Sequence, residues 1–125
     1  MLRRLLDFRG RRYAAERAAL EAGAGPREVA AFLLRWRLNW EDGSRASLRR
    51  DVEHLMLLAE RACALGHEGA GRELLELCRE YLEVLNDDGA FRADGRMMKV
   101  EAARRAAELI RAVELGARKL AEGMG

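Results

Sequence analysis

The sequence predicts an all-α protein: a four- or five-helix bundle built around a central antiparallel helical hairpin, with a long C-terminal helix. Ala, Leu, Arg and Glu dominate the 125 residues, and there is a single proline; this is a helix-forming composition. Apolar residues recur three and four positions apart, as on one face of an α-helix. Glycine-containing turns separate these segments. We expect one helical domain over residues 1–125, since this length can bury a single core.

Residues 2–22 form the first predicted helix. Leu6, Tyr13 and Leu20 share one face at heptad spacing. Gly10 weakens the middle of this helix, because glycine costs about 1 kcal/mol relative to alanine in a helix interior. Arginines crowd the N-terminal half, and a glycine-rich turn ends the segment.

Pro26 begins the second predicted helix, because proline is favoured at the first helical position. We expect this helix to run to about Trp40, with Val29, Leu33, Trp36 and Trp40 on one line. Two tryptophans four residues apart on an apolar face are typical of a core or a subunit interface. A cofactor or base-stacking role is the alternative, although nothing nearby supplies a polar clasp for such a ligand.

The central hairpin spans residues 47–85 and turns at Gly66. Both of its helices have wide apolar arcs, so each is expected to contact neighbours on more than one side. Gly66 supplies the left-handed residue that commonly ends a helix, and Ser44 or Ser47 can cap the first helix. A turn this short makes the two helices pack antiparallel.

This hairpin resembles a single tetratricopeptide unit over one period of about 34 residues. The residues that carry the resemblance are Leu55, Leu58, Ala59, Ala62, Gly66, Gly71, Leu75 and Cys78. The bulky tryptophan and tyrosine positions of that family hold Leu55 and Ala62 here, and its closing proline is absent. The resemblance implies a hairpin with small residues where the helices cross. It does not imply the family's peptide binding, because the sequence holds no second copy and a solenoid needs about three.

The last predicted helix runs from about Arg96 to Ala121, after a connection over residues 86–95. Its small and apolar residues alternate three and four positions apart and form a narrow seam. The seam consists of Ala103, Ala106, Ile110, Val113, Ala117 and Leu120. Such a seam suits close antiparallel packing or a coiled-coil contact with another chain.

Charge is distributed unevenly, although the formal net charge is +2. Residues 1–50 have a net charge of +6, residues 51–95 of −7 and residues 96–125 of +3. Four glutamates repeat three and four positions apart along the second hairpin helix: Glu73, Glu76, Glu80 and Glu83. Opposite charge in different parts of a chain favours head-to-tail or domain-to-domain contact.

The first functional hypothesis is a non-enzymatic helical protein-interaction module, such as a small bacterial assembly, adaptor or regulatory subunit. Its expected partner is another protein or a second copy of the chain. The candidate interface consists of Trp36, Trp40, Ala103, Ala106, Ile110, Val113, Ala117 and Leu120.

The alternative hypothesis is a nucleic-acid-associated protein. An arginine patch forms if the first helix lies beside the start of the hairpin, and it would bind phosphates without reading bases. The candidate contacts are Arg3, Arg4, Arg9, Arg11, Arg12, Arg45, Arg49 and Arg50. Residues 21–30 also resemble the first half of a helix-turn-helix, but the expected recognition helix does not follow.

Catalytic and metal-binding patterns are weak. Asp51 and His54 share a helix face, but a di-metal bundle uses two carboxylate-x-x-histidine pairs together with further glutamates. Cys63, His67 and Cys78 can approach one another across the hairpin turn, but their spacing is irregular and includes no CxxC pair. No nucleotide-binding loop or nucleophile motif is present. We therefore expect no enzyme activity, no metal and no cofactor.

No run of 18 apolar residues is present, and the basic N-terminus is not followed by an apolar segment of signal-peptide type. We expect a cytoplasmic protein with no membrane partner, in which a disulfide is unfavourable.

Overall fold

The computed structural model describes residues 2–38, 44–87 and 100–124, with side chains from residue 10 in the first helix and from residue 103 in the last. The helices are α1 (Leu2–Glu21), α2 (Pro26–Arg35), α3 (Arg45–Ala64), α4 (Glu68–Asn86) and α5 (Val100–Met124). The predicted all-α class, the antiparallel α3–α4 hairpin and the long C-terminal helix are confirmed. These described ranges contain no strand.

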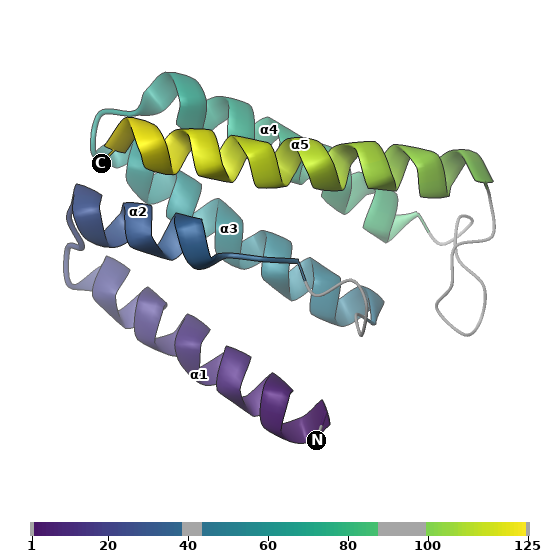
Figure 1. Cartoon of the computed structure of the whole chain (residues 1–125), viewed down its shortest axis with the longest axis horizontal. Helices are drawn as coiled ribbons and strands as arrows, with labels where there is room; N and C mark the ends of the chain where they lie inside the picture. Colours follow the sequence, from purple (N-terminus) through teal and green to yellow (C-terminus); the bar gives the residue numbers. More distant parts are fainter. Residues whose placement is uncertain (1, 39–43, 88–99, 125) are drawn as a thin grey trace.

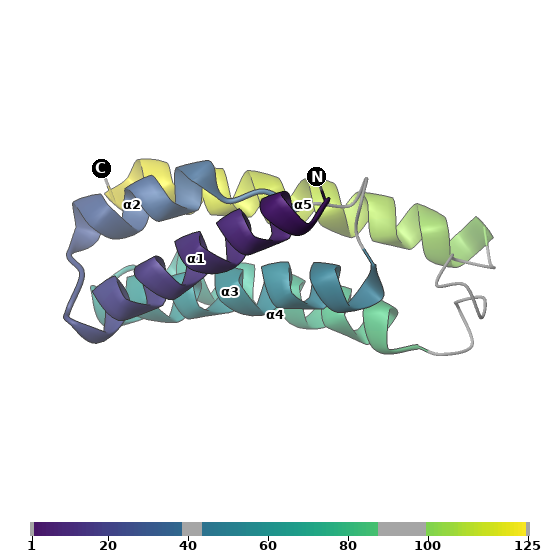
Figure 2. The same ribbon diagram turned by 90° about the horizontal axis from the view of Figure 1, so that it is seen from below.

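Helices α2 to α5 form a ring in which each helix packs against the next, and α1 lies outside the ring against α3 (Figure 1). The view turned by 90° shows the same order in depth, with α1 in front of α3 and α4 farther back (Figure 2). The largest buried aliphatic side chains lie inside the ring: Leu33, Leu55, Leu58, Leu74, Leu85 and Leu120. From the described part of α1, the side chains that are fully buried are Tyr13 and Glu16. Helix α1 is therefore attached differently from the other four.

The crossing of α3 and α4 is unusually close at Gly71. A Cβ atom at this position would lie 2.5 Å from Sγ of Cys63 and 3.2 Å from the carbonyl oxygen of Ala59. Ala59 and Ala62 have no exposed surface. The small residues expected at the crossing are thus found there, and they let the two helices pack closely.

Specific backbone contacts end α1 and α3. Gly66 has φ of 100°, and the next N–H, of His67, donates to the carbonyl of Ala62 at 2.9 Å. Gly23 has φ of 90° and is followed by the same kind of bond. Both are left-handed helix ends that glycine adopts without a steric penalty. At the start of α3, the hydroxyl of Ser44 accepts the N–H of Ser47, which identifies Ser44 as the cap.

The prediction that the second helix runs to Trp40 is wrong, because α2 ends at Arg35. Trp36 has extended backbone with ψ of 136°. It is nevertheless buried, and its indole N–H donates to the backbone oxygen of Asp51 at 2.9 Å. The tryptophan therefore reaches α3 from an extended segment instead of continuing the apolar line of α2. Trp40 lies outside the described residues.

Helix α5 continues beyond the predicted end at Ala121. It reaches Met124, which is itself buried. The predicted start at Arg96 lies outside the described residues. At 25 residues α5 spans about 38 Å. None of the helices in the described ranges combines the length and apolar character needed to cross a membrane.

Candidate functional site

The buried polar side chains of the described residues gather at the contact between α1 and α3. Glu16 is 2% exposed, Asp51 has no exposed surface and His54 is 4% exposed. Buried polar groups are costly unless they are hydrogen-bonded. Each of these side chains accordingly has a partner on another helix, and the contacts form one cluster.

Asp51 lies where four segments meet. The hydroxyl of Tyr13 on α1 donates to Oδ1 of Asp51 at 2.7 Å, and the indole of Trp36 donates to its backbone oxygen. Tyr81 of α4 is close enough to feel the charge of this carboxylate. Burial, followed by the charge of Asp51, raises the pKa of Tyr81 to about 12. Asp51 thus connects α1, the segment after α2, and the α3–α4 hairpin.

Glu16 connects α1 to both neighbouring helices. Its Oε1 lies 2.9 Å from Nε2 of His54, and its Oε2 accepts from the guanidinium of Arg35 at 2.7 and 2.8 Å. Above this pair the rings of Tyr13 and His54 stack, with centroids 3.9 Å apart and planes 18° apart. In the described part of α1, these polar contacts and the ring stacking join the helix to α2 and α3.

The spacing of the paired residues along the sequence explains how α1 and α3 are aligned with each other. Tyr13 and Glu16 are three residues apart on α1, and Asp51 and His54 are three residues apart on α3. Residues at this spacing share a helix face. Because α1 and α3 run in the same direction (Figure 1), the first members of the two pairs meet and so do the second members.

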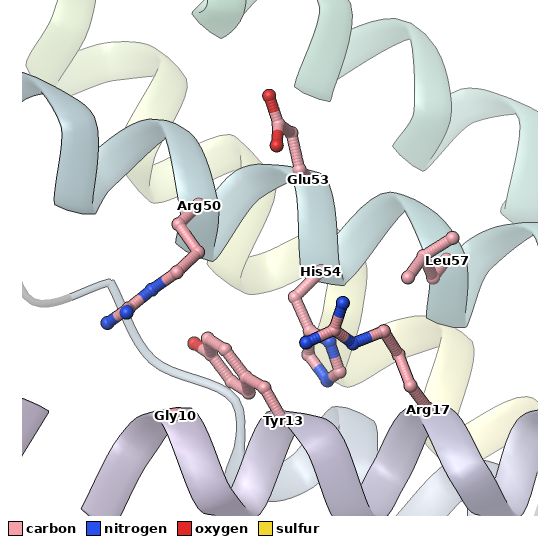
Figure 3. Close-up of a pocket in the computed structure, with 7 residues that line it drawn as sticks. All are labelled: Gly10, Tyr13, Arg17, Arg50, Glu53, His54 and Leu57. Carbon is pink, nitrogen blue, oxygen red and sulfur yellow. The ribbon is translucent and has the colours of Figure 1, made fainter. Parts of the chain in front are cut away.

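A cleft of about 380 Å³ opens beside this cluster, between α1 and α3. Figure 3 shows Tyr13 and His54 at its centre, with Arg17 and Arg50 around them. Both arginines are exposed. The guanidinium of Arg50 lies 6.0 Å from the centre of the Tyr13 ring. Gly10 and Leu57, which carry no charge, also line the cleft.

The arginines proposed as nucleic-acid contacts are placed as follows. Arg12 of α1 and Arg50 of α3 both lie over the ring of Tyr13, Arg12 at 5.5 Å. Arg11 is exposed, and Nε of Arg49 is buried with no hydrogen-bond partner among the described residues. Arg45 donates to the backbone oxygen of Leu85 and so ties the hairpin ends together. The side chains of Arg3, Arg4 and Arg9 lie outside the described part of α1.

The seam of α5 proposed as an interface faces the chain's own core. Ala106, Val113, Ala117 and Leu120 are buried there, Ile110 is partly buried and Ala103 is exposed. Trp36 is buried as well. In this conformation the buried members pack against other helices of the same chain, so a second chain would have to bind elsewhere.

The residues considered as metal ligands are engaged differently. Asp51 and His54 bind Tyr13 and Glu16, as described above. Cys78 is buried, and its burial, partly opposed by the charge of neighbouring Arg79, raises the pKa of the thiol to about 12. Across the described ranges, no three His, Cys, Asp or Glu side chains are placed to hold a metal ion together.

Glu16, Arg17 and Arg35 were not singled out from the sequence. Glu16 carried a usable signal, because it lies three residues after Tyr13 on the otherwise apolar face of the first helix. A carboxylate on such a face predicts a buried polar partner on a neighbouring helix. Arg17 and Arg35 carried no such signal, since one of many arginines is distinguished only by its neighbours in space.

Comparison of the chain with protein-family models gives no match, and comparisons with curated proteins and with solved structures give no significant similarity.

Proposed function

We propose that this protein is a non-enzymatic helical interaction module that associates through two faces of opposite charge. The observation that carries the proposal is the placement of these faces. The basic face comprises Arg17 and Arg50, which line the cleft between α1 and α3, together with Arg11, which is exposed on another side of α1. The acidic face comprises Glu73, Glu76, Glu80 and Glu83 on α4.

The side chains of both faces are available to a partner. All seven are exposed. Among the acidic residues, Glu80 makes a surface ion pair with Arg105 at 3.6 Å, with both side chains about half exposed. Surface pairs of this kind contribute little to stability, typically below about 1 kcal/mol. The ion pair with Arg105 would therefore compete only weakly with a partner that binds Glu80.

The two faces are carried by different helices. Both views place α1 and α4 on either side of α3 (Figures 1 and 2). The basic face of one chain can therefore meet the acidic face of a second chain. Contact between unlike faces of identical chains is head-to-tail, and it leaves a free face of each kind at the ends of the assembly.

Nucleic acid is the second candidate partner, and the basic face itself favours it. α1 lies beside the start of α3, so arginines of both helices share one surface and two of them flank the Tyr13 ring. Phosphates bind such a surface through charge, and the affinity falls steeply as salt rises.

Light scattering behind a sizing column, with absorbance read at 260 and 280 nm, separates the two candidates. If the chain is an interaction module, light scattering should give a mass above the 14.1 kDa of one chain at low salt. The mass should return to 14.1 kDa at high salt, and the absorbance ratio should be that of protein. Excess absorbance at 260 nm that salt removes would favour nucleic acid. A 14.1 kDa species at every salt and protein concentration would contradict self-association.

A further inference from the structure

We propose that the cleft between α1 and α3 is a binding site for a small organic anion that carries two phosphate or carboxylate groups. This site goes beyond the interaction proposed above and does not require two chains to associate. Its charge, its floor and its open space each support the assignment.

Two arginines from different helices supply the charge. Arg17 and Arg50 make no ion pair within the described ranges. Guanidinium groups stay charged at physiological pH and form paired hydrogen bonds to carboxylate or phosphate. Figure 3 shows Arg50 at the hydroxyl end of Tyr13 and Arg17 over His54. Glu53, a carboxylate in the lining, points away from these rings (Figure 3).

The placement of the arginines sets the kind of ligand. Arg17 and Arg50 lie at different ends of the floor, so each can bind its own anionic group. A ligand with two such groups would use both, whereas a single small anion would reach one. The volume of about 380 Å³ is within the range of small-molecule sites. Leu57, which is 38% exposed, gives the carbon body of the ligand an apolar surface.

The floor of the cleft is fixed before any ligand arrives. Tyr13 is held by its hydrogen bond to Asp51, and His54 by its contact with Glu16. The two rings also stack on each other. Binding therefore loses little conformational entropy in the floor, and ordering is confined to the two arginine side chains.

Gly10 is the third feature, because its presence in α1 has no packing reason. Glycine is unfavourable within a helix, yet none of the described atoms lies within 4 Å of where a Cβ atom at position 10 would be. Gly10, Tyr13 and Arg17 follow one another at three and four residues and so share the face that lines the cleft. A side chain at position 10 would occupy the cleft, and glycine leaves it open.

Isothermal titration calorimetry on the full chain tests the site with three probes: inorganic phosphate, succinate and fructose 1,6-bisphosphate. We expect at least one of the two-group probes to bind ten or more times more tightly than phosphate. Succinate would indicate a dicarboxylate and the bisphosphate a phosphorylated compound. If neither binds more tightly than phosphate, the proposal is wrong.

Variants locate the binding. Arg17→Ala and Arg50→Ala should each weaken binding of the tighter probe at least tenfold, and Arg118→Ala, an exposed arginine of α5, should leave it unchanged. Gly10→Leu should abolish binding while the melting temperature stays equal or rises, because leucine favours the helix. Unchanged binding in Gly10→Leu, or equal losses in all three arginine variants, would contradict a site in the cleft. Light scattering of the ligand-free chain tests self-association independently.

Discussion

Glu16 joins the described part of α1 to two other helices through a single side chain. Its two carboxylate oxygens bind side chains of two other helices, His54 on α3 and Arg35 on α2. A buried carboxylate of this kind is stable only while its partners stay in place, because removing one partner of a buried charge leaves the other unpaired. Position 16 should therefore tolerate substitution far less well than the exposed positions of the same helix.

Glu16→Gln should lower the free energy of unfolding by about 1–3 kcal/mol, since the amide cannot satisfy both His54 and Arg35 as the carboxylate does. Urea unfolding measures the change. Glu21→Gln is the matched control, because Glu21 is exposed on the same helix and should change stability by less than about 0.5 kcal/mol. Equal effects of the two substitutions would show that the Glu16 contacts do not stabilise the fold.

Cys78 and Tyr81 make stability depend on pH in the alkaline range. Burial raises the pKa of Cys78 from 9.0 and that of Tyr81 from 10.0, both to about 12. The unfolded chain thus loses these protons at a lower pH than the folded chain does. The contribution of Cys78 to stability is complete below about pH 9 and that of Tyr81 below about pH 10, and both are lost as pH rises toward 12.

Urea unfolding at pH 8 and pH 11 checks this sign. The native chain should lose stability between the two pH values, and a Cys78→Ala, Tyr81→Phe double variant should lose less. A decrease of the same size in both proteins would assign the effect to other groups.

At the scale of elements, the α3–α4 hairpin depends on the close crossing at Gly71. Gly71→Ala should lower the free energy of unfolding by about 1–3 kcal/mol, because the new methyl group meets Cys63 and the backbone of Ala59. Gly69→Ala on the same helix meets nothing within 4 Å and should leave stability equal or slightly higher.

A second substitution identifies the contact. Cys63→Ala removes the nearer of the two atoms, so adding it to Gly71→Ala should cost less than the sum of the two single changes. Strict additivity in urea unfolding would mean that the crossing relaxes in some other way.

Elements with strong periodicity and clear end signals could be predicted from the sequence. The hairpin and its turn at Gly66 follow from local rules that act within a few residues, and of the two serines expected as caps the structure selects Ser44. The end of α2 could not be predicted in this way, because it depends on a hydrogen bond from Trp36 to α3. The same limit applies to the candidate site, where Glu16 and Arg35 are 19 residues apart and meet only in the folded chain.

At the scale of the whole molecule, the basic face lies on α1 and α3 and the acidic face on α4. α3 contacts α1 on one side and α4 on the other, so the sequence order of basic and acidic segments becomes an order in space. The uneven charge could be predicted from the sequence. The placement of the charged helices relative to one another could not, because it depends on which helices become neighbours.

Mixing two charge-reversed variants tests the proposed interaction most directly. In one variant Arg11, Arg17 and Arg50 are each replaced by glutamate. In the other variant Glu73, Glu76 and Glu83 are each replaced by arginine. All six positions are exposed, so both variants should fold, which circular dichroism would verify. Each variant has two faces of like charge and should remain a single chain at low salt. Light scattering of the mixture should then show association of the two variants. If the mixture contains only single chains, or if either variant associates alone as the native chain does, the chains do not associate through these two faces.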